Sequence, residues 1–347
     1  MTFKKLPVID LSLDKPDTKA ILLAQLKDAL FRVGFLYLIN HGVDSEADRI
    51  MEIAPKAFEI PFDEKLKVAM TKNPHFVGYT QLGAETTAKA TDIREQYDFG
   101  SATEPNTETE PQWKRLKGPS LYIRDEVLRG FKTAVTDYIS RMEKLASRLL
   151  ELIAESLNLP AETFKPFEGE MNRLKLVKYP PVEGDASRQG VGPHKDSSGM
   201  LTFVLQDDVG GLQVLNSEGE WISADPIRGS FVVNIAQGFE ALTGGRCGAT
   251  THRVVSPSGL TRYSIPYFHS VRLNLTMNDI REQLDFIQGR IPEPSDEKKR
   301  QVDVPSEFLD PKYSCFGEAH LRNRIVSHKD VAAIWYADIK DKYIMES

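Results

Sequence analysis

Apolar residues recur at helical spacing in several parts of the chain. Leucines stand four residues apart through 17–33, and an apolar stripe of similar period runs through 123–157, so each segment predicts an amphipathic helix. A further helix is expected over 45–58, where Ser45 and Asp48 have the spacing of a helix-capping pair. Each of these helices would bury one face against a common core.

Shorter apolar runs bounded by Gly, Pro, Asp and Ser predict strands. We expect them at 6–11, 35–39, 172–179, 201–206, 211–214, 230–235, 252–255 and 262–269. Most of these runs follow one another in the second half of the chain, which favours an antiparallel sandwich or jelly roll over alternating βαβ units. The predicted fold class is therefore mainly β with flanking helices.

The same pattern divides the chain into four regions. We expect an N-terminal region of helices and strands over 1–120, a long supporting helix over 121–160, a jelly-roll core over 161–290, and a C-terminal loop with a capping helix over 291–347. Two short helices are expected at 278–287 and 329–340. Residues 78–118 are rich in Thr, Glu, Pro and Gly and predict long loops with short strands, which in a compact domain are often functional.

Composition and charge exclude several classes of protein. The chain has 347 residues and a formal net charge of -6, and it lacks the basic face expected of a nucleic-acid binder. Only two cysteines are present, Cys247 and Cys315, too few for a disulfide framework or a cysteine-rich zinc site. No apolar run approaches the length of a membrane span. We therefore expect a cytoplasmic protein with no membrane partner.

One histidine pair and one carboxylate have the spacing of a metal site. His194 and Asp196 are two residues apart, so on an extended segment they point to the same face. His252, at the start of another predicted strand, would complete a set of two histidines and one carboxylate. Such a set leaves coordination positions open and suits non-haem Fe(II) oxygenases, whereas His-x-Asp alone is also common in ordinary turns.

Arg262 and Ser264 repeat this same-face spacing on the next predicted strand. Together they offer a fork of N–H donors and a hydroxyl, which suit the free carboxylate of a metal-chelating 2-oxo acid. A surface salt bridge is the alternative role for Arg262, and a solvent-facing strand position is the alternative for Ser264.

The order of these residues is similar to that of a known family. The chain resembles the isopenicillin N synthase-like family of Fe(II)- and 2-oxoglutarate-dependent dioxygenases, whose core is a double-stranded β-helix, or jelly roll. The resemblance covers nearly the whole chain. It is carried by residues 6–10, 34–37, 40–43, 179–181, 194–198, 210–214, 221, 233–235, 252–255 and 262–265.

This resemblance implies roles for the candidate residues. The two histidines and the aspartate would bind Fe(II), while Arg262 and Ser264 would hold the distal carboxylate of 2-oxoglutarate with help from Tyr179. Parity places Phe268 on the same strand face as Arg262, and the family often uses the matching position to contact substrate. O2 would be consumed and 2-oxoglutarate decarboxylated to succinate and CO2. A small molecule, by resemblance one of specialised metabolism, would be hydroxylated, desaturated or cyclised.

Three alternatives remain open from the residues alone. The first is an iron oxidase of the same fold that does not use 2-oxoglutarate, and the second is a non-catalytic jelly-roll module that binds a ligand or partner. The third is a zinc hydrolase, since two histidines and an aspartate also suit Zn²⁺, although Arg262 and Ser264 would then be unexplained. The loops of 78–118 and the C-terminal helix are expected to shape the substrate pocket.

Overall fold

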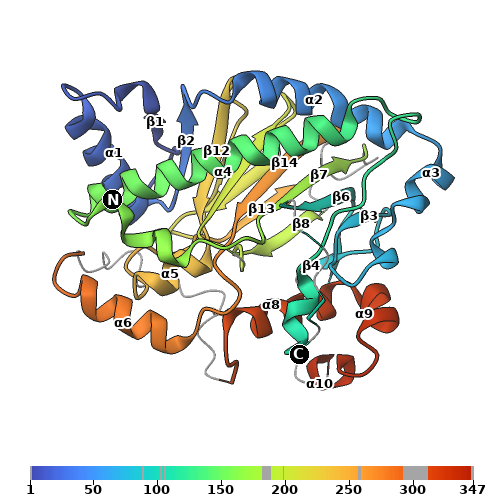
Figure 1. Cartoon of the computed structure of the whole chain (residues 1–347). Helices are drawn as coiled ribbons and strands as arrows, with labels where there is room; N and C mark the ends of the chain where they lie inside the picture. Colours follow the sequence, from blue (N-terminus) through green and yellow to red (C-terminus); the bar gives the residue numbers. More distant parts are fainter. Residues whose placement is uncertain are drawn as a thin grey trace.

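Two β-sheets face each other in the computed structural model, which describes residues 2–87, 90–101, 104, 107–108, 110–181, 189–197, 199–256, 259–291 and 312–344. The main sheet has eight strands in the order β1-β2-β12-β9-β14-β7-β6-β3, and the smaller sheet has four in the order β11-β10-β13-β8 (Figure 1). All neighbours in the two sheets are antiparallel except β1 and β2. This arrangement confirms the predicted double-stranded β-helix core.

The strands have the following bounds. The main sheet contains β1 (Val8–Asp10), β2 (Phe35–Ile39), β12 (Ser230–Ile235), β9 (Leu201–Gln206), β14 (Arg262–His269), β7 (Arg173–Tyr179), β6 (Glu95–Gly100) and β3 (Gly78–Thr80). The smaller sheet contains β11 (Trp221–Ser223), β10 (Leu212–Leu215), β13 (His252–Val255) and β8 (Gln189–His194), and a separate pair is formed by β4 (Thr86–Thr87) and β5 (Ala90–Thr91).

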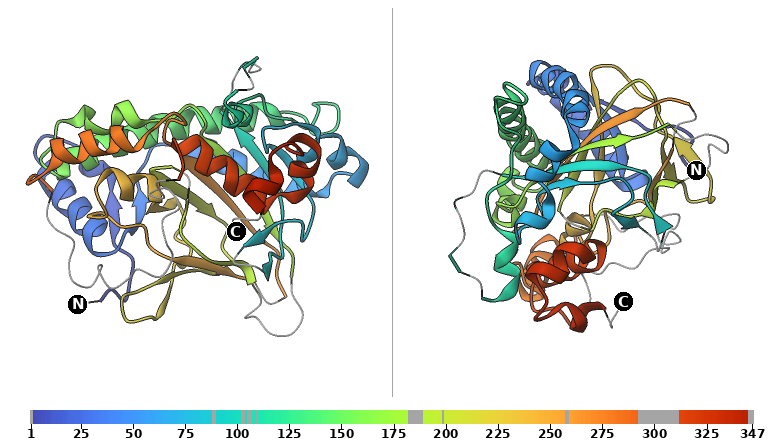
Figure 2. Two further views of the ribbon diagram at one scale, coloured as in Figure 1. Left: turned by 90° about the horizontal axis from the view of Figure 1, so that it is seen from below. Right: turned by 90° about the vertical axis from the view of Figure 1, so that its right-hand side faces the viewer.

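Helices cover the outer face of the main sheet. α4 crosses this sheet in Figure 1, and α1 and α2 pack against α4. The C-terminal helices α8 to α10 pack near the end of the sheets that carries β3 and β4, as Figure 2 also shows. The bounds are α1 (Lys19–Arg32), α2 (Asp44–Glu59), α3 (Phe62–Lys67), α4 (Phe131–Ser156), α5 (Gln237–Leu242), α6 (Met277–Ile287), α8 (Phe316–Ser327), α9 (Lys329–Trp335) and α10 (Lys340–Ile344).

Alternate residues of the main-sheet strands enter two different cores. Leu174 and Leu176 of β7 pack in the large core on the side of the helices. Val177 and Tyr179 of the same strand belong to the second cluster, which lies between the sheets and also contains Val254 of the smaller sheet. Successive side chains of a strand point to opposite faces, so this division follows directly from the strand period. The space between the sheets is where the candidate residues converge.

Strand prediction succeeded where the sequence is apolar and failed where it is not. The expected strands at 35–39, 201–206, 230–235, 252–255 and 262–269 are confirmed residue for residue. β8 was not expected, because its sequence Gln-Gly-Val-Gly-Pro-His is poor in strand-forming residues. Pairing with β13 makes it a strand nevertheless. β11 was also missed, whereas β3, β4, β5 and β6 fall within 78–118, where long loops with short strands were predicted.

Three helix predictions need correction. The long helix begins at Phe131 rather than near 123, since Gly130 directly before it has φ +76° and ends the preceding turn. α2 begins at Asp44 without a side-chain cap, and the Ser45 hydroxyl donates instead to Glu46. The helix expected at 329–340 ends at Trp335, and another begins at Lys340.

The C-terminal region also contains a helix that was not predicted, α8, directly before α9. The predicted C-terminal loop falls largely at 292–311, outside the described residues. The boundaries of the four regions stay a prediction. Among the described helices, none combines the length and apolar character needed to cross a membrane.

Candidate active site

His194 and His252 are cross-strand partners in the smaller sheet. His194 is the last residue of β8 and lies opposite His252, the first residue of β13, with 4.3 Å between the ring centres. The Nε2 atom of each histidine lies 3.7 Å from Oδ1 of Asp196. One ligand atom from each of the three residues lies within 4.8 Å of the others, a spacing that allows all three to bind one ion. The predicted metal set is therefore brought together.

Backbone carbonyls orient both imidazoles. Nδ1 of His194 lies 2.8 Å from the carbonyl oxygen of Gly192, and Nδ1 of His252 lies 3.1 Å from that of Thr250. Because a carbonyl only accepts, each Nδ1 carries the proton and each Nε2 presents a lone pair toward Asp196. The edge of the Phe35 ring packs against His252 with 5.1 Å between ring centres. Both rings are thus held in the orientation that a metal ligand requires.

The two carboxylate oxygens of Asp196 have different neighbours. Oδ1 faces the imidazoles, while Oδ2 accepts a hydrogen bond of 2.7 Å from Nδ2 of Asn234 on β12. Burial raises the pKa of Asp196, but the two histidines and Asn234 outweigh it, so the pKa lies below its usual value. Burial and the neighbouring His252 lower the pKa of His194 to about 4. At neutral pH the site therefore offers a carboxylate and an uncharged His194 imidazole.

The loop after Asp196 is fixed by close backbone contacts. The N–H of Gln237 donates to the Asp196 carbonyl at 2.9 Å, and the N–H of Met200 donates to that of His269 at 2.7 Å. Gly199 has φ +104°, and a Cβ at this position would lie 2.4 Å from the His269 carbonyl oxygen. Only glycine fits here, which is why a Gly follows so soon after the carboxylate.

Arg262 is a buried cation with unused donors. Its side chain is 1% exposed, and its Nη2 donates to Oε1 of Gln206 at 3.2 Å. Nε and Nη1 are buried and have no hydrogen-bond partner among the described residues. The Tyr179 ring packs beside the guanidinium, 4.9 Å from Cζ, and Ser264 lies two residues along the same strand face. The group is arranged to receive an anion, so the surface roles considered for Arg262 and Ser264 are wrong.

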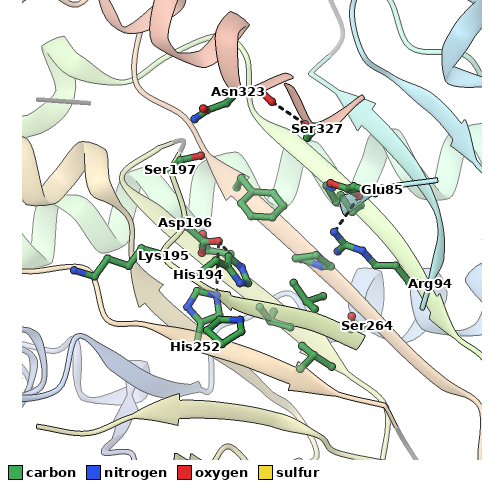
Figure 3. Close-up of a pocket in the computed structure, with 18 of the residues that line it drawn as sticks. Glu85, Arg94, His194, Lys195, Asp196, Ser197, His252, Ser264, Asn323 and Ser327 are labelled. Carbon is green, nitrogen blue, oxygen red and sulfur yellow. Dashed lines mark hydrogen bonds and ion pairs between the residues drawn. The ribbon is translucent and has the colours of Figure 1, made fainter. Parts of the chain in front are cut away.

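One cavity of about 580 Å³ is lined by the candidate metal ligands and by the proposed cosubstrate residues, namely His194, Asp196, His252, Arg262, Ser264 and Tyr179. Phe268 lines it as well, on the strand face that parity predicted for Arg262, Ser264 and Phe268. Figure 3 shows the metal set on one side of the cavity, Ser264 apart from it, and Glu85 with Arg94 on another side. Asn323 and Ser327 of α8 line the cavity from the C-terminal helices. The prediction that the segment 78–118 shapes the pocket is confirmed by Glu85 and Arg94; the C-terminal residues belong to α8 rather than to the expected helix.

Sequence reasoning missed several residues that support the site. Asn234 and Phe35 were noted only as parts of the family resemblance, and Gln206 only as the end of a strand. Lys175 could have been found by parity, since it stands four residues before Tyr179 on the same strand face. The remaining histidines, 41, 75, 269, 320 and 328, are all buried or half-buried, and His320 lines the cavity.

Comparisons with known proteins agree with this geometry. Residues 6–124 match the family model described as the N-terminal region of non-haem dioxygenases in morphine synthesis, and residues 170–271 match that of the 2OG-Fe(II) oxygenase superfamily. A protein named 2-oxoglutarate-dependent dioxygenase frbJ, from Dothideomycetidae sp., is 39% identical, with 96% of this chain and 93% of that protein covered. The chain belongs to the 2OG-Fe(II) oxygenase superfamily.

Two more members of the superfamily extend the comparison. Homoarginine-6-hydroxylase 2-ODD-C23.1 of Arabidopsis thaliana is 33% identical over 84% of this chain and 90% of its own length. The crystal structure of a putative 2OG-Fe(II) oxygenase family protein from Caulobacter crescentus superposes with a TM-score of 0.72 at 25% identity, covering 94% of this chain and all of that one.

Membership in this superfamily decides between the alternatives left open by the residues. The protein is a 2-oxoglutarate-dependent dioxygenase that uses Fe(II) and acts on a small-molecule substrate. This conclusion sets aside the oxidase without 2-oxoglutarate, the non-catalytic binding module and the zinc hydrolase. The donor set fits Fe(II) by its chemistry, with two imidazole nitrogens and one carboxylate oxygen around a single point.

Proposed function

We propose that this enzyme oxidises a C–H bond of a small-molecule metabolite, by hydroxylation, desaturation or ring closure, while 2-oxoglutarate is decarboxylated to succinate and CO2. His194, Asp196 and His252 would hold the iron. Arg262, Ser264 and Tyr179 would hold the cosubstrate. The convergence of both groups on one cavity is the observation that carries the proposal. The relative named as a hydroxylase favours hydroxylation as the outcome.

The chain's own residues have three tasks in this reaction. His194, His252 and Asp196 would hold the ion with one ligand atom each, a set of two histidines and one carboxylate that leaves coordination positions open. Bound Fe(II) with 2-oxoglutarate supplies the activation of O2. Apolar side chains between the sheets, among them Val204, Leu212 and Val254, limit the entry of water.

Arg262 orients the cosubstrate through its far carboxylate. Its Nε and Nη1 atoms lack partners, and a carboxylate accepting from this guanidinium would complete a charge-assisted pair. The Tyr179 ring holds the guanidinium plane from the side, and the Ser264 hydroxyl supplies another donor. Because this carboxylate is fixed, the oxo-acid end of the molecule is directed toward the metal set.

The proposal is tested by the stoichiometry of turnover. Purified protein with Fe(II), 2-oxoglutarate, O2 and a panel of candidate metabolites should form succinate and one oxidised product in equal amounts. Succinate would be quantified by chromatography and the product by mass spectrometry. Substrate oxidation at full rate with no 2-oxoglutarate added would refute the proposal.

Asn234 gives a further test of the metal site. Asn234→Ala removes the amide that holds Asp196 Oδ2 and should weaken Fe(II) binding about 10- to 100-fold, the usual effect of losing a group that orients a metal ligand. An Fe(II) titration under anaerobic conditions measures this change. Asn278→Ala, on the exposed side of α6, serves as the control and should bind iron like the wild type. Equal affinity in both variants would show that Asn234 does not orient the carboxylate.

A further inference from the structure

One end of the cavity is walled by buried charges that neither the metal nor the cosubstrate uses. Lys175 on β7 and Arg324 on α8 line it, and their side chains are 9% and 11% exposed. Asp98 on β6, which is fully buried, lies opposite Lys175 in the strand pairing. Long charged side chains are rarely buried to this degree without close partners.

The contacts that Lys175 and Arg324 make with carboxylates are long. Lys175 Nζ lies 3.6 Å from Asp98 Oδ1 and 3.5 Å from Glu85 Oε1, and Arg324 Nη1 lies 3.9 Å from Asp98 Oδ1. Asp98 Oδ1 has no hydrogen-bond partner within the described ranges. Neither cation makes a side-chain hydrogen bond with another described residue. A charge-assisted hydrogen bond needs about 2.7–2.9 Å, so the donors of both cations are left incompletely used.

Positive charge is in excess at this end. Arg94 is closely paired, at 3.0 Å from both Glu85 and Asp92. Among the described residues, the buried charges there include four cations (Arg94, Arg173, Lys175 and Arg324) and three carboxylates (Glu85, Asp92 and Asp98).

The pKa values of two neighbouring groups, Arg173 and His320, are lowered by burial and by nearby positive charge. Burial and the charge of Arg324 lower the pKa of Arg173 to about 9, although its guanidinium stays protonated at neutral pH. Burial, Arg324 and Arg173 also hold the pKa of His320 well below its usual value. In both groups burial is the larger cause, and the nearby guanidinium charge adds to it.

This end is distinct from the place proposed for the cosubstrate. Tyr179 pairs with Arg262, and Lys175 lies four residues from Tyr179 along β7, which corresponds to about 13 Å. Phe268 lies opposite Arg173 in the strand pairing, near Lys175 and away from Arg262, and it lines the cavity. A 2-oxoglutarate molecule with one end at the metal and the other at Arg262 has no carboxylate left for Lys175.

We propose that Lys175 and Arg324 form a substrate subsite that binds a carboxylate of the molecule to be oxidised. This inference rests on the proposed function, and it defines the substrate class as small carboxylic acids, amino acids among them. The carboxylate would complete the hydrogen bonds of both cations and compensate the excess charge. It would also anchor the substrate at one end while the rest passes Phe268 toward the metal set.

The test compares acids with their uncharged amides by calorimetric titration under anaerobic conditions, with Fe(II) and 2-oxoglutarate bound. The probes are hexanoate and hexanamide, 3-phenylpropionate and its amide, L-leucine and L-leucinamide, and L-arginine and L-argininamide. At least one acid should bind about 10- to 100-fold more tightly than its amide, the value of a hydrogen-bonded buried charge. A panel in which no acid binds better than its amide would overturn the inference.

Variants assign this preference to the two residues. Arg324→Gln and Lys175→Met should each reduce the acid-to-amide ratio to about one-tenth of the wild-type value or less. Lys178→Met is the matched control, because Lys178 is on the same strand but pairs with Glu95 on the opposite face, and it should keep the ratio. Because two separate variants are tested, misfolding of one of them cannot decide the result. Thermal melting verifies that each variant is folded.

The affinity for 2-oxoglutarate separates the two proposals. If Arg324→Gln weakens 2-oxoglutarate binding and leaves the acid preference intact, the cations serve the cosubstrate and the inference is wrong. If wild-type protein forms no succinate but still prefers acids in the titration, the proposed reaction fails while the subsite stands.

Discussion

Asp196→Ala is expected to lose Fe(II) binding and succinate formation together. Asp196 supplies the only carboxylate of the metal set and lies 3.7 Å from both histidine Nε2 atoms. Because loss of a group that merely orients a ligand costs about 10- to 100-fold, loss of the ligand itself should reduce affinity and turnover by more than about 100-fold. An anaerobic Fe(II) titration and a succinate assay measure the two effects.

A second aspartate provides the control for this experiment. Asp137 is half-exposed on α4 and pairs with Arg49, so Asp137→Ala removes the same charge far from the cavity. It should keep iron binding and turnover, since exposed ion pairs contribute little to stability. Succinate formation by Asp196→Ala at the rate of this control would mean that the metal is held elsewhere.

Arg262→Gln should raise the KM for 2-oxoglutarate by at least about 30-fold. Removing one partner of a buried, hydrogen-bonded charge pair costs about 2–5 kcal/mol, and each 1.4 kcal/mol corresponds to a tenfold change. Arg262 is 1% exposed, and its Nε and Nη1 atoms have no hydrogen-bond partner among the described residues. Because water does not reach this guanidinium, solvent screening does not reduce the expected rise in KM. Initial rates of succinate formation over a range of 2-oxoglutarate concentrations give the KM.

Arg262→Lys distinguishes charge from geometry at this position. Lysine keeps the charge but cannot present two parallel N–H donors, so we expect a KM between those of the wild type and Arg262→Gln. Thermal melting should accompany both variants, because Gln206 loses its hydrogen bond to Arg262 in Arg262→Gln. An unchanged KM in Arg262→Gln with a normal melting temperature would contradict the assignment of the cosubstrate carboxylate.

Strand period made much of this site predictable from sequence. His194 and Asp196 have same-face spacing, and so do Arg262, Ser264 and Phe268 along β14; the structure places all of them on one cavity. The same-face spacing within each segment needed no knowledge of the sheet order, whereas their meeting in one site was implied by the family resemblance. The cross-strand pairing of His194 with His252 did depend on the sheet, because β8 carries too few strand-forming residues to be recognised.

The charged end of the cavity shows where sequence reasoning stops. Lys175, Asp98 and Arg324 come from β7, β6 and α8, and only tertiary packing brings them together. Each would be read alone as an ordinary surface charge, since such residues are seldom buried. α8 was missed for a related reason: both its faces carry polar residues, so it lacks a clear apolar stripe.

The place of β2 in the main sheet constrains how the chain is made. Phe35 pairs with Asn234, a partner roughly 200 residues later, and ribosomes add about 5–20 residues per second. The apolar segment Phe35–Ile39 must therefore wait on the order of 10–40 s for its partner strand during synthesis. Throughout that interval it is an open strand edge, the kind of surface that aggregates unless a chaperone shields it. Production of this enzyme in a foreign host should depend on chaperone supply more than on the stability of the finished fold.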